Sequence, residues 1–349
     1  MRLTRYNTYK IILCLIATLG TQGCGSNSEK SDSLKTEPEP EPKSAAQLDA
    51  QAATSSLAVG ARTLRFRTRL APFPRLRGDN TLVHLPPTFQ YSQKIPVILF
   101  FHGFHGCISV VAGNQDVPCV PGGRTARHLN LISQVNESGT SAILIIPQMG
   151  SPRDNQEQIG GFAQTGFMRD YLNEVLTKVG SMLGVSMGID QLGPLMLASH
   201  SAGYIGILAA LRYGQISPDE IVLLDSFYAG QNEFRNWIQS NSGRFILGTT
   251  KTVDSNPPAR FISLFQEQGR VQRNSEHLLQ WIKEQPGLFD TEKAILHRPF
   301  GSNLSHLGES DVNHSFVISA VPGDHAGVAR SSFLTILRGS EFGKTDSSR

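Results

Sequence analysis

Two continuously apolar runs constrain the fold of this chain most strongly. They are residues 97–101 (Val-Ile-Leu-Phe-Phe) and residues 142–146 (Ala-Ile-Leu-Ile-Ile). A short strand without a polar position has to be buried on both faces, as in a parallel sheet covered by helices. Similar runs recur at residues 195–199 and 220–224, with longer amphipathic stretches between them. The pattern predicts an α/β fold with a mostly parallel, doubly wound sheet flanked by helices.

We expect about eight strands, at residues 64–70, 81–85, 97–101, 142–146, 195–199, 220–224, 261–265 and 314–318. Helices are expected at residues 125–137, 166–183, 202–213, 232–239, 275–284 and 327–337. In the first strand, Arg65, Arg67 and Arg69 alternate with less polar residues, which is typical of a strand with one face in water. This strand is expected to begin the sheet in antiparallel orientation.

The composition is that of a folded globular protein, with 39% hydrophobic and 17% charged residues. The formal charge of +3 arises in the first 23 residues, which contain Arg2, Arg5 and Lys10 and no acid. The rest of the chain has 29 residues of each sign, so a nucleic-acid partner is not expected.

Residues 1–23 have the layout of a signal peptide: basic residues, the apolar stretch 11–19, and small and polar residues leading to Cys24. The segment resembles the signal of bacterial lipoproteins, although Thr21 stands where that pattern usually has Leu. The resemblance implies acylation of Cys24, for example with palmitate, and anchoring to a membrane of the bacterial envelope. Secretion after simple cleavage is the alternative.

Residues 24–60 are rich in Ser, Glu, Pro and Ala and are expected to form a disordered tether. The folded domain is expected at residues 61–340, followed by a flexible tail at 341–349. Within the domain, an oxidising compartment favours a disulfide between Cys107 and Cys119, with two buried thiols as the alternative.

Ser201 is the candidate nucleophile. The strand at 195–199 runs into His200-Ser201-Ala202-Gly203 and then into a helix of small residues. This arrangement resembles the G-x-S-x-G nucleophile elbow of the α/β-hydrolase superfamily, with Ser199 in place of the first glycine. The resemblance implies an α/β-hydrolase fold and a serine hydrolase that needs no cofactor.

The strand at 97–101 ends in His102-Gly103-Phe104-His105-Gly106. α/β-Hydrolases have a His-Gly loop here, and the resemblance implies an oxyanion hole formed by the backbone N–H groups of Phe104 and Ala202, with Gly103 allowing close approach. Zinc binding by His102, His105 and His128 is the competing interpretation. Because these residues lack a familiar ligand spacing, no metal is expected.

The same resemblance implies that an acid and then a histidine follow the nucleophile along the chain. His325, in the predicted loop before the last helix, is the candidate base, with His306 and His314 as alternatives. Asp225, at the end of the strand 220–224, is the candidate acid, with Glu267 as the alternative and Asp324 less favoured.

Taken together, these residues predict an exported, lipid-anchored serine hydrolase that cleaves a small or lipid-like carboxylic ester through Ser201, His325 and Asp225. An amidase or peptidase of the same mechanism is one alternative, and a catalytically silent envelope binding protein is another. Residues 108–123, 148–165 and 286–310 are expected to form substrate loops. The side chains Phe162, Phe167, Arg153 and Arg169, in or next to these segments, would suit either an acyl chain or an anionic group, and the sequence does not choose between them. The sequence does not indicate an oligomeric state.

Overall fold

The computed structural model describes residues 60–70, 78–150, 159–250, 262–285, 295–298, 316–321 and 324–340. The chain divides into Met1–Thr54 and Ser55–Arg349, and all described residues belong to the second unit. The predicted signal peptide, Cys24, the tether up to residue 59 and the tail lie outside the described residues. Within the described part, no helix is long and apolar enough to span a membrane.

The large sheet contains nine strands: β1 (Arg62–Phe66), β2 (Thr81–Leu85), β3 (Ile95–Phe101), β6 (Ile143–Pro147), β7 (Leu192–His200), β8 (Glu220–Leu224), β9 (Arg244–Thr250), β10 (Ile295–Arg298) and β11 (Phe316–Val321). β4 (Val117–Pro118) and β5 (Thr125–Ala126) pair separately. The helices are α2 (Ile108–Ala112), α3 (Leu131–Ser138), α4 (Phe167–Leu183), α5 (Tyr204–Tyr213), α6 (Gln231–Ser240), α7 (Ile262–Lys283) and α9 (His325–Arg338), with short 3₁₀ turns η1 (Gly160–Ala163), η2 (Ile189–Gln191) and η3 (Ser201–Gly203).

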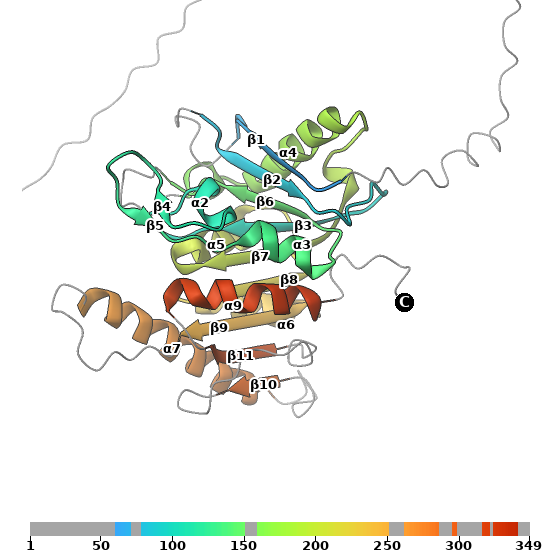
Figure 1. The fold of residues 1–349 in the computed structure, drawn as a ribbon. Coiled ribbons are helices and arrows are strands. Elements are labelled where there is room, and N and C mark those ends of the chain that lie inside the picture. The colour runs from blue at the N-terminus through green and yellow to red at the C-terminus, as the bar shows by residue number, and fades with distance from the viewer. Residues whose placement is uncertain are drawn as a thin grey trace, which may run out of the picture. The chain divides into compact units, whose positions relative to one another are not determined.

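The strand order in the large sheet is β1-β2-β6-β3-β7-β8-β9-β11-β10. β2 is antiparallel to both of its neighbours, and every other adjacent pair is parallel. Figure 1 shows the strands stacked in this order, with helices packed along the sheet. The α/β class and the mostly parallel, doubly wound sheet predicted from the sequence are confirmed.

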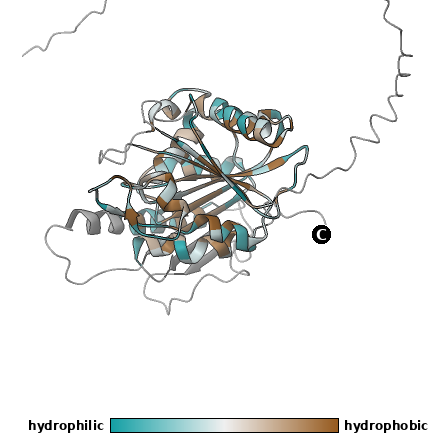
Figure 2. Ribbon diagram, turned by 45° about the horizontal axis from the view of Figure 1, so that its top comes forward, coloured by the Kyte–Doolittle hydropathy of each residue, from teal (hydrophilic) through white to brown (hydrophobic). Residues whose placement is uncertain are grey.

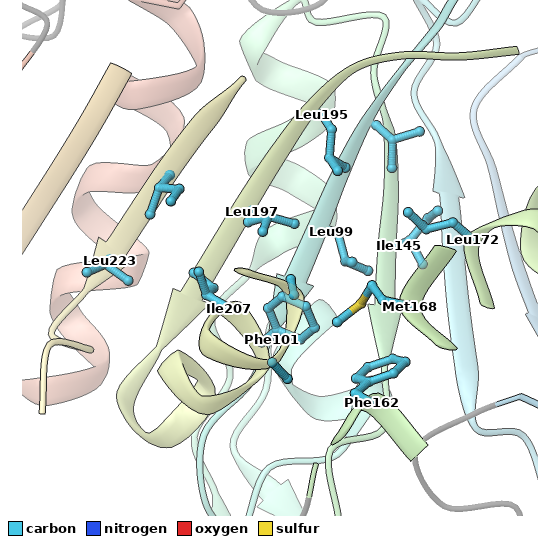
Figure 3. Close-up of a cluster of buried hydrophobic side chains, with 14 of the residues drawn as sticks. Leu99, Phe101, Ile145, Phe162, Met168, Leu172, Leu195, Leu197, Ile207 and Leu223 are labelled. Carbon is cyan, nitrogen blue, oxygen red and sulfur yellow. The ribbon is translucent and has the colours of Figure 1, made fainter. Parts of the chain in front are cut away.

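Both faces of the sheet are buried, as the apolar runs require. Alternate residues of β3 belong to different cores: Leu99 and Phe101 face helices α4–α7, whereas Ile98 and Phe100 face α2, α3 and α9. Figure 2 shows hydrophobic colour along the central strands, and Figure 3 shows Phe101 packed near Phe162 and Met168 in the first core.

Helices α3 and α9 lie side by side (Figure 1), and a buried glutamine joins them. The Gln134 Nε2 amide donates to the carbonyls of Leu129 (2.7 Å) and Ala329 (3.3 Å), and its Oε1 accepts from the N–H of Leu334 (2.8 Å). Because all these polar groups are satisfied in a buried setting, α9 is held firmly in place. His325 is the first residue of that helix.

Two predicted elements are wrong. The strand expected at 261–265 is not formed, because the described residues from Ile262 onward belong to helix α7. The strand that lies next to β8 in the sheet is β9, which pairs in parallel with both β8 and β11. A short apolar run does not distinguish a strand from a buried helical segment. The helix expected at 125–137 begins at Leu131, since residues 125 and 126 form β5.

Candidate active site

Ser201 lies at a sharp bend between a strand and a helix. β7 ends at His200, Ser201 begins the turn η3, and α5 starts at Tyr204. Ser201 has a φ of 56°, in the left-handed region that residues other than glycine rarely occupy. Backbone strain of this kind is typical of functional sites. Here the strained turn directs the chain, and with it Ser201, away from the direction of β7.

Two glycines make the bend possible. A Cβ at Gly203 would lie 2.0 Å from the carbonyl oxygen of Phe101, and a Cβ at Gly103 would lie 2.5 Å from the Cβ of Ser201. Neither distance is sterically possible, so both positions require glycine. The loop after β3 therefore packs directly against the serine.

The serine that replaces the first glycine of the elbow motif has a defined partner. The Ser226 hydroxyl donates to the carbonyl of Ser201 (2.6 Å), so it accepts a hydrogen bond from the buried hydroxyl of Ser199 (2.8 Å). The backbone of the strained residue is thus fixed from the end of β8. This chain accommodates Ser199 because Ser226 satisfies its hydroxyl.

His325 and Asp225 form a hydrogen-bonded pair beside the elbow. The distance from His325 Nδ1 to Asp225 Oδ2 is 2.6 Å, and the carboxylate is 1% exposed. Asp225 has a φ of 48°, and its N–H donates to the carbonyl of Gly248 in β9 (2.6 Å). β9 therefore holds the backbone of Asp225 in this conformation. With the carboxylate as acceptor, Nδ1 donates the proton of this bond, and in the neutral tautomer that this bond selects Nε2 is the acceptor.

The elements that carry these residues also define the type of fold. An elbow serine follows a central strand, a glycine loop follows β3, and the order along the chain is Ser201, Asp225, His325. This is the α/β-hydrolase fold.

Ser201 and His325 line one cavity of about 810 Å³. Gly103, Phe104 and Ala202 also line it, so the predicted oxyanion residues lie at the same opening as the serine. Ala202 is at the start of a helical segment, where backbone N–H groups favour negative charge. Phe104 exposes 44% of its surface and so borders the cavity with an aromatic ring.

The loop after β3 is held by residues at the end of β6. His102 is buried; its Nδ1–H donates to the carbonyl of Gly103 (2.9 Å), and its Nε2 accepts from the N–H of Met149 (3.1 Å). Burial lowers the pKa of His102 to about 4, so the ring is neutral, as these two bonds require. The Gln148 Nε2 amide donates to the carbonyl of Gly106 (3.1 Å), and its Oε1 accepts from the N–H of Ile108 (3.1 Å).

A second histidine packs on His325. The rings of His200 and His325 lie 4.5 Å apart, and His200 Nε2–H donates to the backbone carbonyl of His325 (2.9 Å). Burial, followed by the neighbouring His325, places the pKa of His200 well below its usual value. His200 is thus a neutral donor that fixes the first residue of α9.

The predicted disulfide between Cys107 and Cys119 is present, with a Cα–Cα distance of 5.8 Å. Cys107 is the N-cap residue of α2, one position after Gly106 of the glycine loop. The cross-link closes the segment that leads to Arg124, Thr125 and Ala126 on the cavity wall.

Two of the three histidines considered as zinc ligands, His102 and His128, have other partners. Both ring nitrogens of His102 are engaged, and His128 Nδ1 lies 2.6 Å from Asp116 Oδ1. The backbone N–H of His128, followed by Arg127, lowers the pKa of Asp116. Among the described residues, no cluster of three or more His, Cys, Asp or Glu side chains suits a metal ion.

The two alternative acids have other positions or partners in the structure. Glu267 belongs to helix α7, not to a segment after a strand. Asp324 caps α9: its Oδ1 accepts from the N–H of Gly327 (2.6 Å) and from Arg330 Nη2 (3.1 Å). His306 and His314 lie outside the described residues.

The predicted substrate loops are partly corrected. Phe162 is fully buried and packs against Phe101 and Tyr171, so it is a core residue and does not face the cavity. Phe167 packs against the same core as the first residue of α4. Residues 151–158 and most of 286–310 lie outside the described part. Val111 lines the cavity, as expected for the segment 108–123, but it belongs to helix α2 and not to a loop.

Sequence comparison finds no matching family model. It also finds no matching curated protein. Similar solved structures exist at low identity. The feruloyl esterase module from Clostridium thermocellum is 13% identical, with 81% of this chain and 89% of that chain covered and a TM-score of 0.45.

Carboxyl esterase 2 from Tuber melanosporum is 14% identical, with 86% and 97% of the two chains covered and a TM-score of 0.39. An IroE-like serine hydrolase from Shewanella oneidensis is 12% identical, with 80% and 79% covered and a TM-score of 0.41.

The sequence did not lead us to His200, Ser226 or Gln148. His200 and Ser226 are the chain neighbours of Ser201 and Asp225, so adjacency to the candidate catalytic residues was the available signal. Gln148 follows the buried strand β6 at the edge of the sheet where sites of doubly wound folds lie.

Proposed function

We propose that this protein is a serine hydrolase that cleaves a carboxylic ester through Ser201, His325 and Asp225. The observation that carries the proposal is the 2.6 Å hydrogen bond between His325 and Asp225, at a cavity that His325 shares with a strained elbow serine. A buried carboxylate, an oriented imidazole and a hydroxyl are the three groups that nucleophilic catalysis requires.

In the first half-reaction, His325 Nε2 accepts the Ser201 hydroxyl proton while the oxygen attacks the ester carbonyl. The N–H groups of Phe104 and Ala202 donate to the oxyanion of the tetrahedral intermediate, which is the state they stabilise most. The imidazolium then gives its proton to the leaving alcohol as the carbon–oxygen bond breaks. The product is an acyl-serine.

In the second half-reaction, His325 accepts a proton from water, which attacks the acyl-serine. Collapse of the second tetrahedral intermediate releases the carboxylic acid and returns the proton to Ser201. Asp225 stays ionised throughout and stabilises the imidazolium in both halves.

Labelling with a fluorophosphonate tests the nucleophile. We expect wild-type protein to be labelled and Ser201→Ala to be unlabelled, with loss of ester hydrolysis. Ser181→Ala is the matched control, since Ser181 is exposed on helix α4 and bonds to its own helix. Absence of labelling in the wild type, with no effect of Ser201→Ala on any activity, would show that the protein is a catalytically silent binding protein.

A panel of esters and the matching amides separates the esterase from an amidase or peptidase. We propose the ester because ester cleavage is the commonest use of this site on this fold, which is an argument by analogy. Faster turnover of the amides than of the esters would overturn that part of the proposal.

We also propose that the protein is exported and anchored in the bacterial envelope through acylated Cys24. The sequence layout of residues 1–24 supports this. A palmitate analogue fed to expressing cells should label the wild type and not Cys24→Ser, which should be released from the membrane fraction. Equal labelling of both would show that Cys24 is not the anchor.

A further inference from the structure

The cavity wall around Ser201 is rich in basic groups. Three arginines line it, Arg124, Arg127 and Arg270, together with His105. The acid in the lining is Asp324. The carboxylate of Asp225 is buried behind His325 and does not line the cavity.

Ion pairs with neighbouring residues neutralise one basic and one acidic side chain of this wall. Arg127 donates to Asp116 Oδ2 (2.7 Å), and Asp324 accepts from Arg330 (3.1 Å). Arg124 and Arg270 form no ion pair with an acid within the part of the chain that the structure describes. Among the described residues, two positive charges without an acidic partner therefore line the same cavity as the nucleophile.

A neighbouring group responds to this field. Burial and then the charge of Arg124 lower the pKa of His105, so His105 adds no positive charge near neutral pH. Arg124 and Arg270 are exposed side chains that line the cavity, and charges of one sign along a concave wall attract a counter-ion more strongly than isolated charges in open water. The field of this wall therefore comes from the arginines and favours an anion.

The remaining lining is largely apolar or aromatic. Val111 and Leu129 are aliphatic, and Phe104, Tyr204 and Tyr228 supply rings, with the two tyrosine rings 5.8 Å apart. Such a surface suits the hydrocarbon body of a small ligand. Guanidinium groups match a carboxylate in two parallel hydrogen bonds.

We propose that this cavity binds an ester substrate that carries a carboxylate. Arg124 and Arg270 bind the carboxylate, while the hydrocarbon part of the substrate lies on the aromatic wall. The inference rests on the proposed function and adds the class of substrate. The carboxylate lies either on the acyl side or on the alcohol side of the ester.

Two matched pairs of substrates test the inference on the full-length protein. para-Nitrophenyl butyrate against the para-nitrophenyl monoester of succinic acid places the charge on the acyl side. Phenyl acetate against para-acetoxybenzoate places it on the alcohol side. We expect kcat/KM to be about tenfold higher for the charged member of at least one pair. A tenfold ratio corresponds to the free energy of about one hydrogen bond to a charged group.

Arg124→Gln and Arg270→Gln should each reduce that charged-to-neutral ratio by about fivefold to tenfold, mainly through KM of the charged ester. Arg169→Gln is the matched control, because Arg169 is exposed on α4 and does not line the cavity. Added salt should lower the ratio for the wild type.

Turnover without preference for a charged ester, or equal ratios in the cavity variants and Arg169→Gln, would overturn the inference and leave the proposed function standing. Loss of both ester turnover and fluorophosphonate labelling in the wild type would overturn the proposed function itself, and the inference with it.

Discussion

At the residue scale, the choice of acid has a direct test. Asp225→Asn keeps the shape of the side chain but removes the charge that orients and stabilises the protonated His325. We expect kcat for ester hydrolysis to fall by a factor on the order of 10² to 10⁴. Glu267→Gln is the comparison variant and should leave kcat close to wild type. A large loss in Glu267→Gln with little loss in Asp225→Asn would reverse the assignment.

We infer that His200 positions His325, and this role can be measured apart from folding. His200→Phe retains a ring beside His325 but removes the donor to its carbonyl, which is 2.9 Å away. Loss of one neutral hydrogen bond is worth about 1 kcal/mol, so we expect kcat to fall about fivefold to tenfold with KM less affected.

His200→Gln provides the rescue for this variant, because its side-chain amide also donates a hydrogen bond. Recovery of kcat in His200→Gln supports positioning through that bond. Equal loss in both variants, with equal thermal destabilisation, would indicate that the histidine acts only through packing.

At the scale of elements, the disulfide closes the segment between the glycine loop and the cavity wall. Cys107 and Cys119 are 12 positions apart, and a cross-link over such a loop contributes about 3 kcal/mol to the free energy of unfolding. We expect the double variant Cys107→Ser, Cys119→Ser to lose about that amount in urea denaturation. An unchanged midpoint and slope would contradict a stabilising role.

The sequence predicts much of this architecture because local signals and burial agree there. Strands such as β3 and β6 have no polar position, and the bend at Ser201 carries the small residues that its geometry requires. β9 was missed because Arg244, Gly248 and two threonines interrupt its apolar pattern. Its place in the sheet is set by pairing with β8 and β11, which is information that a single strand does not contain.

The candidate site also contains some residues that the sequence predicts and others that it does not. Ser201, His325 and the glycine loop have motif neighbours in the sequence, so they were proposed without coordinates. Ser226 and Gln148 act through bonds to residues 25 and 42 positions away, and the charged wall joins Arg124 to Arg270 from distant segments. Only tertiary packing reveals such partners.

At the scale of the whole molecule, buried neutral histidines make stability depend on pH. Burial lowers the pKa of His102 from 6.5 to about 4 and that of His200 well below its usual value. At a pH between the lowered pKa values of the folded chain and the ordinary value of 6.5, the unfolded chain binds more protons than the folded chain. The free energy of unfolding therefore decreases as the pH falls below 6.5. His102 alone contributes about 3 kcal/mol to that decrease by pH 4.

Urea denaturation at several pH values measures this slope. We expect stability to be nearly constant above about pH 7, where the imidazoles are neutral in both states, and to fall steadily below pH 6.5. Stability that rises on acidification would contradict the assignment of these histidines as buried and neutral.

The hydrogen bond between Asp225 and His325 joins residues 100 positions apart, and Gln134 bridges to Leu334 over 200 positions. Contacts of such long range form late in refolding, because closing the chain between them costs entropy before the contact stabilises anything. After dilution from urea, we expect ester hydrolysis to return with the slowest refolding phase and not with the early rise in helical signal. Catalytic competence would then report on completion of the whole sheet, and activity that returned in the first phase would show that the site assembles independently of it.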